Sequence, residues 1–165
     1  MIRRATTEDI ADIMSIVADA QLSLRELDID QWQDGYPSKE VIAEDIASKV
    51  GYVYCVENRI VGYAAIVFDG EGTYTQIAES EWNTTNNYVV VHRLCVRRGD
   101  TKTGIAMALM DYASQMAIAR GCTGFRIDTH RGNTRMLSML EKLGFKYVGV
   151  IYYDSGERLA YDLNL

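Results

Sequence analysis

Tyr88-Val-Val-Val-His-Arg-Leu-Cys-Val96 reads as an apolar strand, and a polar loop at 97–103 joins it to a helix that opens on Thr103-Gly104-Ile105-Ala106. The apolar residues of that helix recur at the helical period, as Ile105, Leu109, Met110, Ala113, Met116 and Ala117. Free backbone N–H groups and the positive end of the helix dipole gather at such a junction. We therefore predict a phosphate site here, with Gly104 in the first helical turn, where the missing Cβ lets a diphosphate approach the backbone.

Spacing separates the phosphate-binding motifs that could explain this junction. Gly99 and Gly104 have the separation of a Walker motif, but Ile105-Ala106 stand where Lys and Ser or Thr must reach the phosphates and magnesium. A dinucleotide-binding fold is unsupported, because no Gly-x-Gly-x-x-Gly follows any strand of the sequence. An ordinary strand-to-helix turn with an exposed basic loop is the alternative that needs no ligand.

A second segment, Phe125-Arg-Ile-Asp-Thr-His-Arg-Gly-Asn133, runs from a strand into a helix at 134–143. Asn133 is a good N-cap, and Gly144 suits the residue after a helix that adopts a left-handed backbone. One face of this helix is apolar, with Met136, Leu137, Leu140 and Leu143. The local pattern therefore predicts a capped amphipathic helix, and a role as a cap alone is one reading of Asn133.

The two segments together resemble the GNAT N-acetyltransferase superfamily, which uses acetyl-coenzyme A. In that family a Gln/Arg-x-x-Gly-x-Gly/Ala loop joins a strand to a helix. An Asn caps the helix that follows the fifth strand, and this helix ends in a Gly-Phe pair. Here the loop is Thr101-Lys-Thr-Gly104-Ile-Ala106, with Thr101 where Gln or Arg is usual, and Asn133 and Gly144-Phe145 fall at the other places. The resemblance covers almost the whole chain.

The resemblance implies that acetyl-coenzyme A is the co-substrate. Relatives bind its thioester carbonyl and pantetheine arm with backbone N–H groups of the strand that precedes the loop, and its phosphates with the loop itself. The implied binding residues are Leu94, Cys95, Val96, Thr101, Lys102, Thr103, Gly104, Ile105, Ala106 and Asn133.

The sequence pattern alternates strands and helices in an α/β manner. We expect strands at 1–5, 52–56, 60–68, 88–96, 123–129, 146–153 and 157–163, and helices at 7–24, 38–48, 104–120 and 134–143. The first helix begins like a capping box at Thr6-x-x-Asp9. The resemblance implies an α/β (α+β) fold: a mixed, mostly antiparallel twisted sheet flanked by helices and splayed between the fourth and fifth strands.

Length and composition fit one domain at 1–165, since 165 residues of which 48% are hydrophobic can bury a sizeable core. No apolar run approaches the ~20 residues of a membrane span. Met1-Ile-Arg-Arg is not followed by the apolar region of a signal peptide, and Cys55, Cys95 and Cys122 lack paired spacing, so we expect reduced core thiols and a cytoplasmic location. A nucleophilic Cys95 is disfavoured, because the sequence places no base beside it.

The net charge of −6 argues against a nucleic-acid partner. Six basic residues nevertheless lie in the two segments that we expect to meet the cofactor: Arg97, Arg98, Lys102, Arg131, Arg135 and Lys142. Glu40, Glu44 and Asp45 could attract a cationic amine or simply form an ordinary solvated surface. His92 and His130 lack metal-ligand spacing, which gives no reason to propose a metal.

His92 is the candidate general base for an attacking amine, because it precedes the cofactor-binding backbone where many relatives carry Glu or His. A buried histidine satisfied by hydrogen bonds is the alternative. The tyrosine that usually protonates the leaving thiolate falls at Leu140, so the acid is unidentified. Tyrosines that could substitute are Tyr88, Tyr147, Tyr152 and Tyr153.

Aromatic residues in two loops are candidates for binding the amine: Trp32 and Tyr36 in one, and Trp82 before the key strand. Packing over a helix end is the alternative explanation of these rings. His130 is a further candidate at the site. We therefore expect an N-acetyltransferase acting on a small-molecule or peptide amine, with a non-catalytic acyl-coenzyme A sensor as the alternative. The acceptor and the oligomeric state, including a homodimer, are left open.

Overall fold

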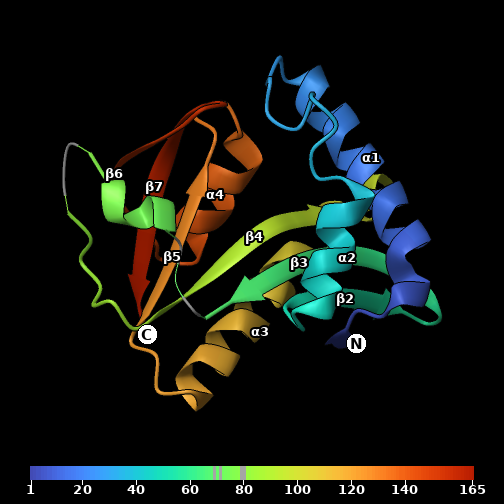
Figure 1. Ribbon diagram of the computed structural model, residues 1–165, viewed down its shortest axis with the longest axis horizontal. Coiled ribbons are helices and arrows are strands. Elements are labelled where there is room, and N and C mark those ends of the chain that lie inside the picture. The colour runs from blue at the N-terminus through green and yellow to red at the C-terminus, as the bar shows by residue number, and fades with distance from the viewer. Residues whose placement is uncertain (69, 71, 79–80) are drawn as a thin grey trace. The chain divides into compact units, whose positions relative to one another are not determined.

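The protein builds a seven-stranded sheet in the order β1-β2-β3-β4-β5-β7-β6 (Figure 1). This computed structural model describes residues 1–68, 70, 72–78 and 81–165, except the side chain of Thr73. β5 runs parallel to β4 and antiparallel to β7, and β2 is antiparallel to both β1 and β3. The strands are β1 Ile2–Arg4, β2 Gly51–Val56, β3 Arg59–Val67, β4 Tyr88–Val96, β5 Gly124–Thr129, β6 Lys146–Tyr153 and β7 Gly156–Asn164.

Among the described residues, four α-helices flank the sheet: α1 Ile10–Glu26, α2 Lys39–Ala47, α3 Ile105–Ala119 and α4 Thr134–Lys142. The predicted fold class is confirmed, and the predicted strand at 88–96 has the observed bounds. The predicted position of Gly104 is wrong: it lies just before the first residue of α3 and not in the first helical turn. Between the predicted strands at 60–68 and 88–96, Gly72–Gln76 forms a 3₁₀ helix and Ala78 bridges to Val150, while residues 69, 71, 79 and 80 lie outside the description.

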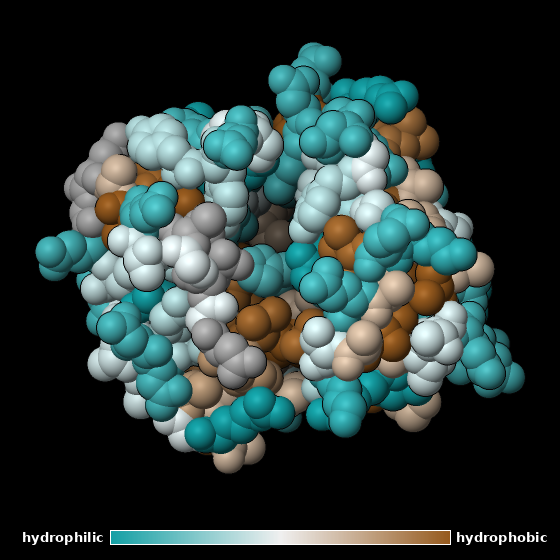
Figure 2. All heavy atoms as spheres, viewed as in Figure 1, coloured by the Kyte–Doolittle hydropathy of each residue, from teal (hydrophilic) through white to brown (hydrophobic). Residues whose placement is uncertain are grey.

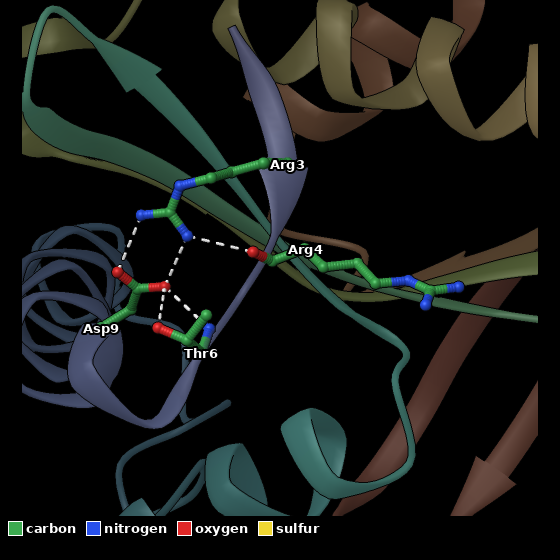
Figure 3. A network of polar contacts seen from close by, with 4 residues as sticks. All are labelled: Arg3, Arg4, Thr6 and Asp9. Atoms are coloured by element: carbon green, nitrogen blue, oxygen red, sulfur yellow. Dashed lines mark hydrogen bonds and ion pairs between the residues drawn. The ribbon is translucent and has the colours of Figure 1, made fainter.

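The start of α1 is held by the capping residues that the sequence predicts. The backbone N–H and the hydroxyl of Thr6 both donate to Oδ2 of Asp9, at 2.8 and 3.1 Å. Arg3, on β1, donates to both carboxylate oxygens of Asp9 at 2.7 and 2.9 Å (Figure 3). The turn Thr7–Asp9 is a 3₁₀ helix that leads into α1. One carboxylate therefore caps a helix and ties it to the first strand.

The chain forms two compact units, and the first contains residues 1–66 and 91–112. One face of its strands packs against α1 and α2, which lie in front of the strands in Figure 1. The other face meets the start of α3, because a Cβ built on Gly62 would lie 2.7 Å from Ile105. Figure 2 shows that the surface over the end of α1 and the loop after it is mostly hydrophilic.

The second unit contains residues 67–90 and 113–165. Its core joins the 3₁₀ helix Gly72–Gln76 to β6 and β7, through Tyr74, Tyr88, Val90, Val148, Ile151 and Ala160. β4 pairs with β5 over its first three residues, Tyr88–Val90 against Gly124–Arg126, and its remaining residues belong to the first unit. Within the described part of the chain, no helix is both long and apolar enough to cross a membrane.

Candidate active site

β4 contains a backbone irregularity at Arg93, whose φ of 54° lies in the left-handed region. Such an angle is uncommon for a residue with a side chain and is costly inside a strand. A residue of this kind interrupts the regular ladder, leaves a strand residue unpaired and re-aims the side chains beside it. The irregularity directly precedes Leu94, Cys95 and Val96. The family resemblance implies that the backbone of these residues binds the thioester.

The side chain of Arg93 belongs to a polar network that spans three other elements. Arg93 Nε and Nη2 donate to the two carboxylate oxygens of Asp45 on α2, at 2.8 and 2.6 Å. Its Nη1 donates to the hydroxyl oxygen of Tyr36, in the loop between α1 and α2, at 2.8 Å. The hydroxyl of Tyr63, on β3, donates to Asp45 at 2.6 Å. A bidentate ion pair therefore joins β4 to α2 and to this loop.

The network is mostly shielded from water, with 14% of the Arg93 side chain and 8% of the Asp45 side chain exposed. Burial is the largest single influence and lowers the pKa of Arg93, but the hydrogen bonds and charge interactions with Asp45 and Tyr36 together outweigh burial and raise the pKa. Burial and the Asp45 charge raise the pKa of Tyr63 far above its usual value, so Tyr63 stays a hydrogen-bond donor. The expectation that Asp45 attracts substrate or forms solvated surface is wrong, because Asp45 is buried in this pair.

The candidate residues on β4 that the sequence suggested lie in different surroundings. Cys95 is 5% exposed, and burial raises the pKa of its thiol to about 12, which disfavours a nucleophilic role. His92 and Leu94 are half-buried on either side of Arg93. His92 also makes a further contact within the structure.

The loop after β4 has the backbone of an anion site. Arg98–Asp100 form a 3₁₀ turn, and the hydroxyl of Thr103 donates to the carbonyl of Asp100. Lys102 and Gly104 both have positive φ, of 67° and 86°, immediately before α3. A Cβ built on Gly104 would have no protein atom within 4 Å, so the space beside this helix N-terminus is open. Successive N–H groups in such turns form concavities that bind anions.

The basic residues of this loop are used differently from one another. Arg97 donates through Nε to the carbonyl of Ile60 at 3.2 Å, and Arg98 pairs with Glu26 at 2.8 Å. Lys102 is exposed beside Gly104. The two arginines thus hold the loop to β3 and α1, and Lys102 is the cation best placed to meet a phosphate group there.

In the second unit, Asn133 caps α4 as predicted, since its Oδ1 accepts from the N–H of Met136 at 3.3 Å. His130 lies after β5, and its Nδ1 accepts from the N–H of Gly132 at 2.9 Å. Leu140 is fully buried on α4. The leucine that replaces the usual tyrosine is therefore a core residue.

The aromatic candidates divide between the two units. The rings of Trp32 and Tyr36 meet edge to face at 6.4 Å, and Trp32 also packs against the core of the first unit. Trp82 belongs to the second unit, where its Nε1 donates to the carbonyl of Tyr74 at 2.8 Å and the guanidinium of Arg126 lies 4.5 Å from its ring. Trp82 has the contacts of a packing residue, whereas Tyr36 reaches β4 through Arg93.

Sequence reasoning missed Arg93 and the function of Asp45. The available signal was a charged residue inside the otherwise apolar strand Tyr88–Val96, since a buried cation needs a partner. The identity of that partner was not readable, because Asp45 lies 48 residues away in the chain. Among the described residues, no group of three histidine, cysteine, aspartate or glutamate side chains could hold a metal ion.

Comparison with known proteins gives consistent results. Residues 21–145 match the family model described as Acetyltransferase (GNAT) family. An acetyltransferase of the GNAT family from Streptococcus agalactiae is 31% identical, with a TM-score of 0.85 over 100% of this chain and 95% of that chain. A candidate acetyltransferase from Staphylococcus aureus is 26% identical, with a TM-score of 0.77 over 99% and 98%. No curated protein matches the chain.

A more distant structure has the same fold. It is the PaiA N-acetyltransferase from Thermoplasma acidophilum in complex with coenzyme A, which is 19% identical, with a TM-score of 0.74 over 100% of this chain and 98% of that chain.

Proposed function

Because the chain belongs to the acetyltransferase (GNAT) family, we propose that it transfers the acetyl group of acetyl-coenzyme A to a primary amine. The loop before α3 would hold the diphosphate through its N–H groups and Lys102, and β4 would hold the thioester through the backbone around Leu94–Val96. The observation that carries the proposal is Gly104, whose left-handed backbone and open Cβ space lie at a helix N-terminus. The coenzyme A complex of the Thermoplasma relative supports the choice of ligand.

The chemistry requires a neutral amine, since an alkylammonium with a pKa near ~10 has no lone pair to attack with. His92 would take the proton from the amine, directly or through water. Backbone N–H groups next to the irregularity at Arg93 would stabilise the carbonyl oxygen as it gains negative charge. The thioester supplies the activated acetyl group. The location that fits this reaction and three buried free cysteines is the cytoplasm.

A binding experiment tests the site of the co-substrate. Acetyl-coenzyme A at about 100 times its dissociation constant should stabilise the protein by roughly 2.7 kcal/mol and raise its melting temperature. Gly104→Val should remove most of this shift, because valine is strained at positive φ and fills the open space. The matched control is Gly121→Val, since Gly121 also has positive φ and open Cβ space but lies after α3.

The control separates loss of the site from general strain. Gly121→Val should lower the melting temperature of the free protein while keeping the shift caused by acetyl-coenzyme A. If millimolar acetyl-coenzyme A gives no shift in the wild-type protein, the proposed function is wrong. An unchanged shift in Gly104→Val would show that acetyl-coenzyme A does not bind at this loop.

An activity experiment separates the enzyme from a sensor on the same fold. Free thiol release from acetyl-coenzyme A is followed with a panel of alkylamines, diamines, amino acids and a peptide with a free N-terminus. Steady release that depends on one of these amines supports the transferase. A clear melting shift without release for any amine would instead support the non-catalytic acyl-coenzyme A binding module.

A further inference from the structure

We propose that Tyr36 is the proton donor to the departing thiolate, held in place by Arg93. This inference rests on the proposed function and supplies the acid that α4 lacks. Leu140 occupies the place of the usual tyrosine, is fully buried and has no proton to give. A donor must therefore come from another element or from water.

The hydroxyl of Tyr36 lies against the guanidinium of Arg93, a residue of the strand that is proposed to bind the thioester. Its oxygen accepts from Arg93 Nη1 at 2.8 Å, and Arg93 directly precedes Leu94–Val96. Within the described part of the chain, no group accepts the hydroxyl proton of Tyr36. The side chain is 39% exposed, so this proton is available to a bound molecule.

The second phenol of the same network shows why Tyr36 and not Tyr63 is suited to this role. Tyr63 is fully buried and already gives its proton to Asp45 at 2.6 Å. Tyr63 donates to Asp45, and Arg93 donates to both Asp45 and Tyr36. Tyr36 therefore accepts a hydrogen bond from the cation Arg93, and its own hydroxyl proton is not used within the network.

The guanidinium also stabilises the product of proton transfer. When Tyr36 gives up its proton, the phenolate oxygen still lies 2.8 Å from Arg93 Nη1. A hydrogen bond from a guanidinium to an anionic oxygen is stronger than one to a neutral oxygen. Asp45 fixes Arg93 from the other side with two hydrogen bonds, so the guanidinium is held in place. Arg93 and Asp45 are positioning residues in this scheme.

The proposed step is balanced within the site. A bond forms between the amine nitrogen and the carbonyl carbon, and the carbon–sulfur bond breaks with its electron pair going to sulfur. Tyr36 gives the proton of its hydroxyl to that sulfur. The phenolate then recovers the proton that the nitrogen loses, through His92 or water. No other reactant is required.

The test uses Tyr36→Phe, which keeps the ring beside Trp32 and removes only the hydroxyl. The main chain of Tyr36 is held independently, because its carbonyl accepts from Gln21 at 3.0 Å and its N–H donates to Asp34 at 3.3 Å. Turnover should fall by about 10- to 100-fold, at or below the ~10²-fold lower bound for a general acid, because a thiolate is a tolerable leaving group. The melting shift with acetyl-coenzyme A should persist. The matched control is Tyr112→Phe, which removes a hydroxyl from α3 in the same unit and should keep wild-type turnover.

The pH dependence separates proton donation from a structural role. The wild-type rate, measured with the amine that is acetylated fastest, should fall at high pH as the donor loses its proton, and Tyr36→Phe should lack this basic limb. Replacing Tyr36 by 3-fluorotyrosine, a more acidic phenol, should move the limb to lower pH. The inference would be overturned by unchanged turnover in Tyr36→Phe, by a basic limb that persists in Tyr36→Phe, or by a limb that 3-fluorotyrosine does not shift. Each of these results would leave the proposed function standing. Absence of transfer by the wild-type protein would overturn both.

Discussion

The roles of two adjacent residues of β4, His92 and Arg93, can be read from the sequence to different degrees. His92 has a side chain type that suits a base near neutral pH, which a reader of the sequence can recognise. Arg93 is recognisable only as a charge in an apolar strand. Its partners in the structure make it the centre of a network, and its backbone angle marks the point where the strand is irregular.

At this scale we predict that His92→Ala lowers turnover by about 10²-fold or more, because a positioned base contributes at least that much. The acidic limb of the pH–rate profile should change as well. The measurement is initial rate against pH, with the melting shift caused by acetyl-coenzyme A as the control for an intact binding site. Wild-type turnover in the variant would show that His92 is a structural histidine.

Among the elements, α4 illustrates a helix whose local signals and tertiary role agree. Asn133 caps it, and Leu140 is fully buried in its last turn, whereas Leu137 on the same apolar face is only partly buried. The cost of removing a side chain depends on the cavity that it leaves. The two leucines therefore give a matched pair for testing the assignment of Leu140 to the core.

We predict that Leu140→Ala destabilises the protein by roughly 2–5 kcal/mol, the range for a buried leucine. Leu137→Ala should cost less, because its side chain is already partly in water. Chemical denaturation with both variants measures the difference. If Leu140→Ala stayed as stable as the wild type and lost transfer, Leu140 would be shaping the thioester pocket and the core assignment would be wrong.

For the molecule as a whole, unfolding in acid should depend on the Arg3–Asp9 pair. Hydrogen bonds from Arg3 lower the pKa of Asp9 by more than burial raises it. A carboxyl group with a lowered pKa in the folded state contributes stability that is present above its unfolded value, near ~3.9, and is lost as the pH falls through the folded pKa. The free energy of unfolding should therefore decrease below about pH 4.

Asp9→Asn should weaken this dependence, because asparagine cannot be protonated in that range. Urea denaturation at pH 6 and at pH 3.5 measures it, with Asp12→Asn, an exposed position on α1, as the control for the loss of one negative charge. Equal pH dependence in Asp9→Asn and the wild type would contradict the role of the pair shown in Figure 3.

Much of the fold and half of the site could be predicted because their signals are local. Helix and strand periodicity, the capping pair Thr6 and Asp9, and the cap at Asn133 each depend on residues within one or two turns. Gly104 was noticed for the same reason, since the order strand, loop and helix together with a glycine is typical of an anion site. Its position one residue before α3 is a detail of geometry that the pattern does not contain.

The sequence by itself thus determined the elements, the family resemblance and the loop expected to bind the co-substrate. Only the tertiary structure decided that Asp45 is a buried partner of Arg93 and that Tyr36 is carried to β4. These residues are separated from Arg93 by 48 and 57 positions in the chain. Such a pairing arises when packing removes charged groups from water and leaves them only one another as partners, and no periodicity records it.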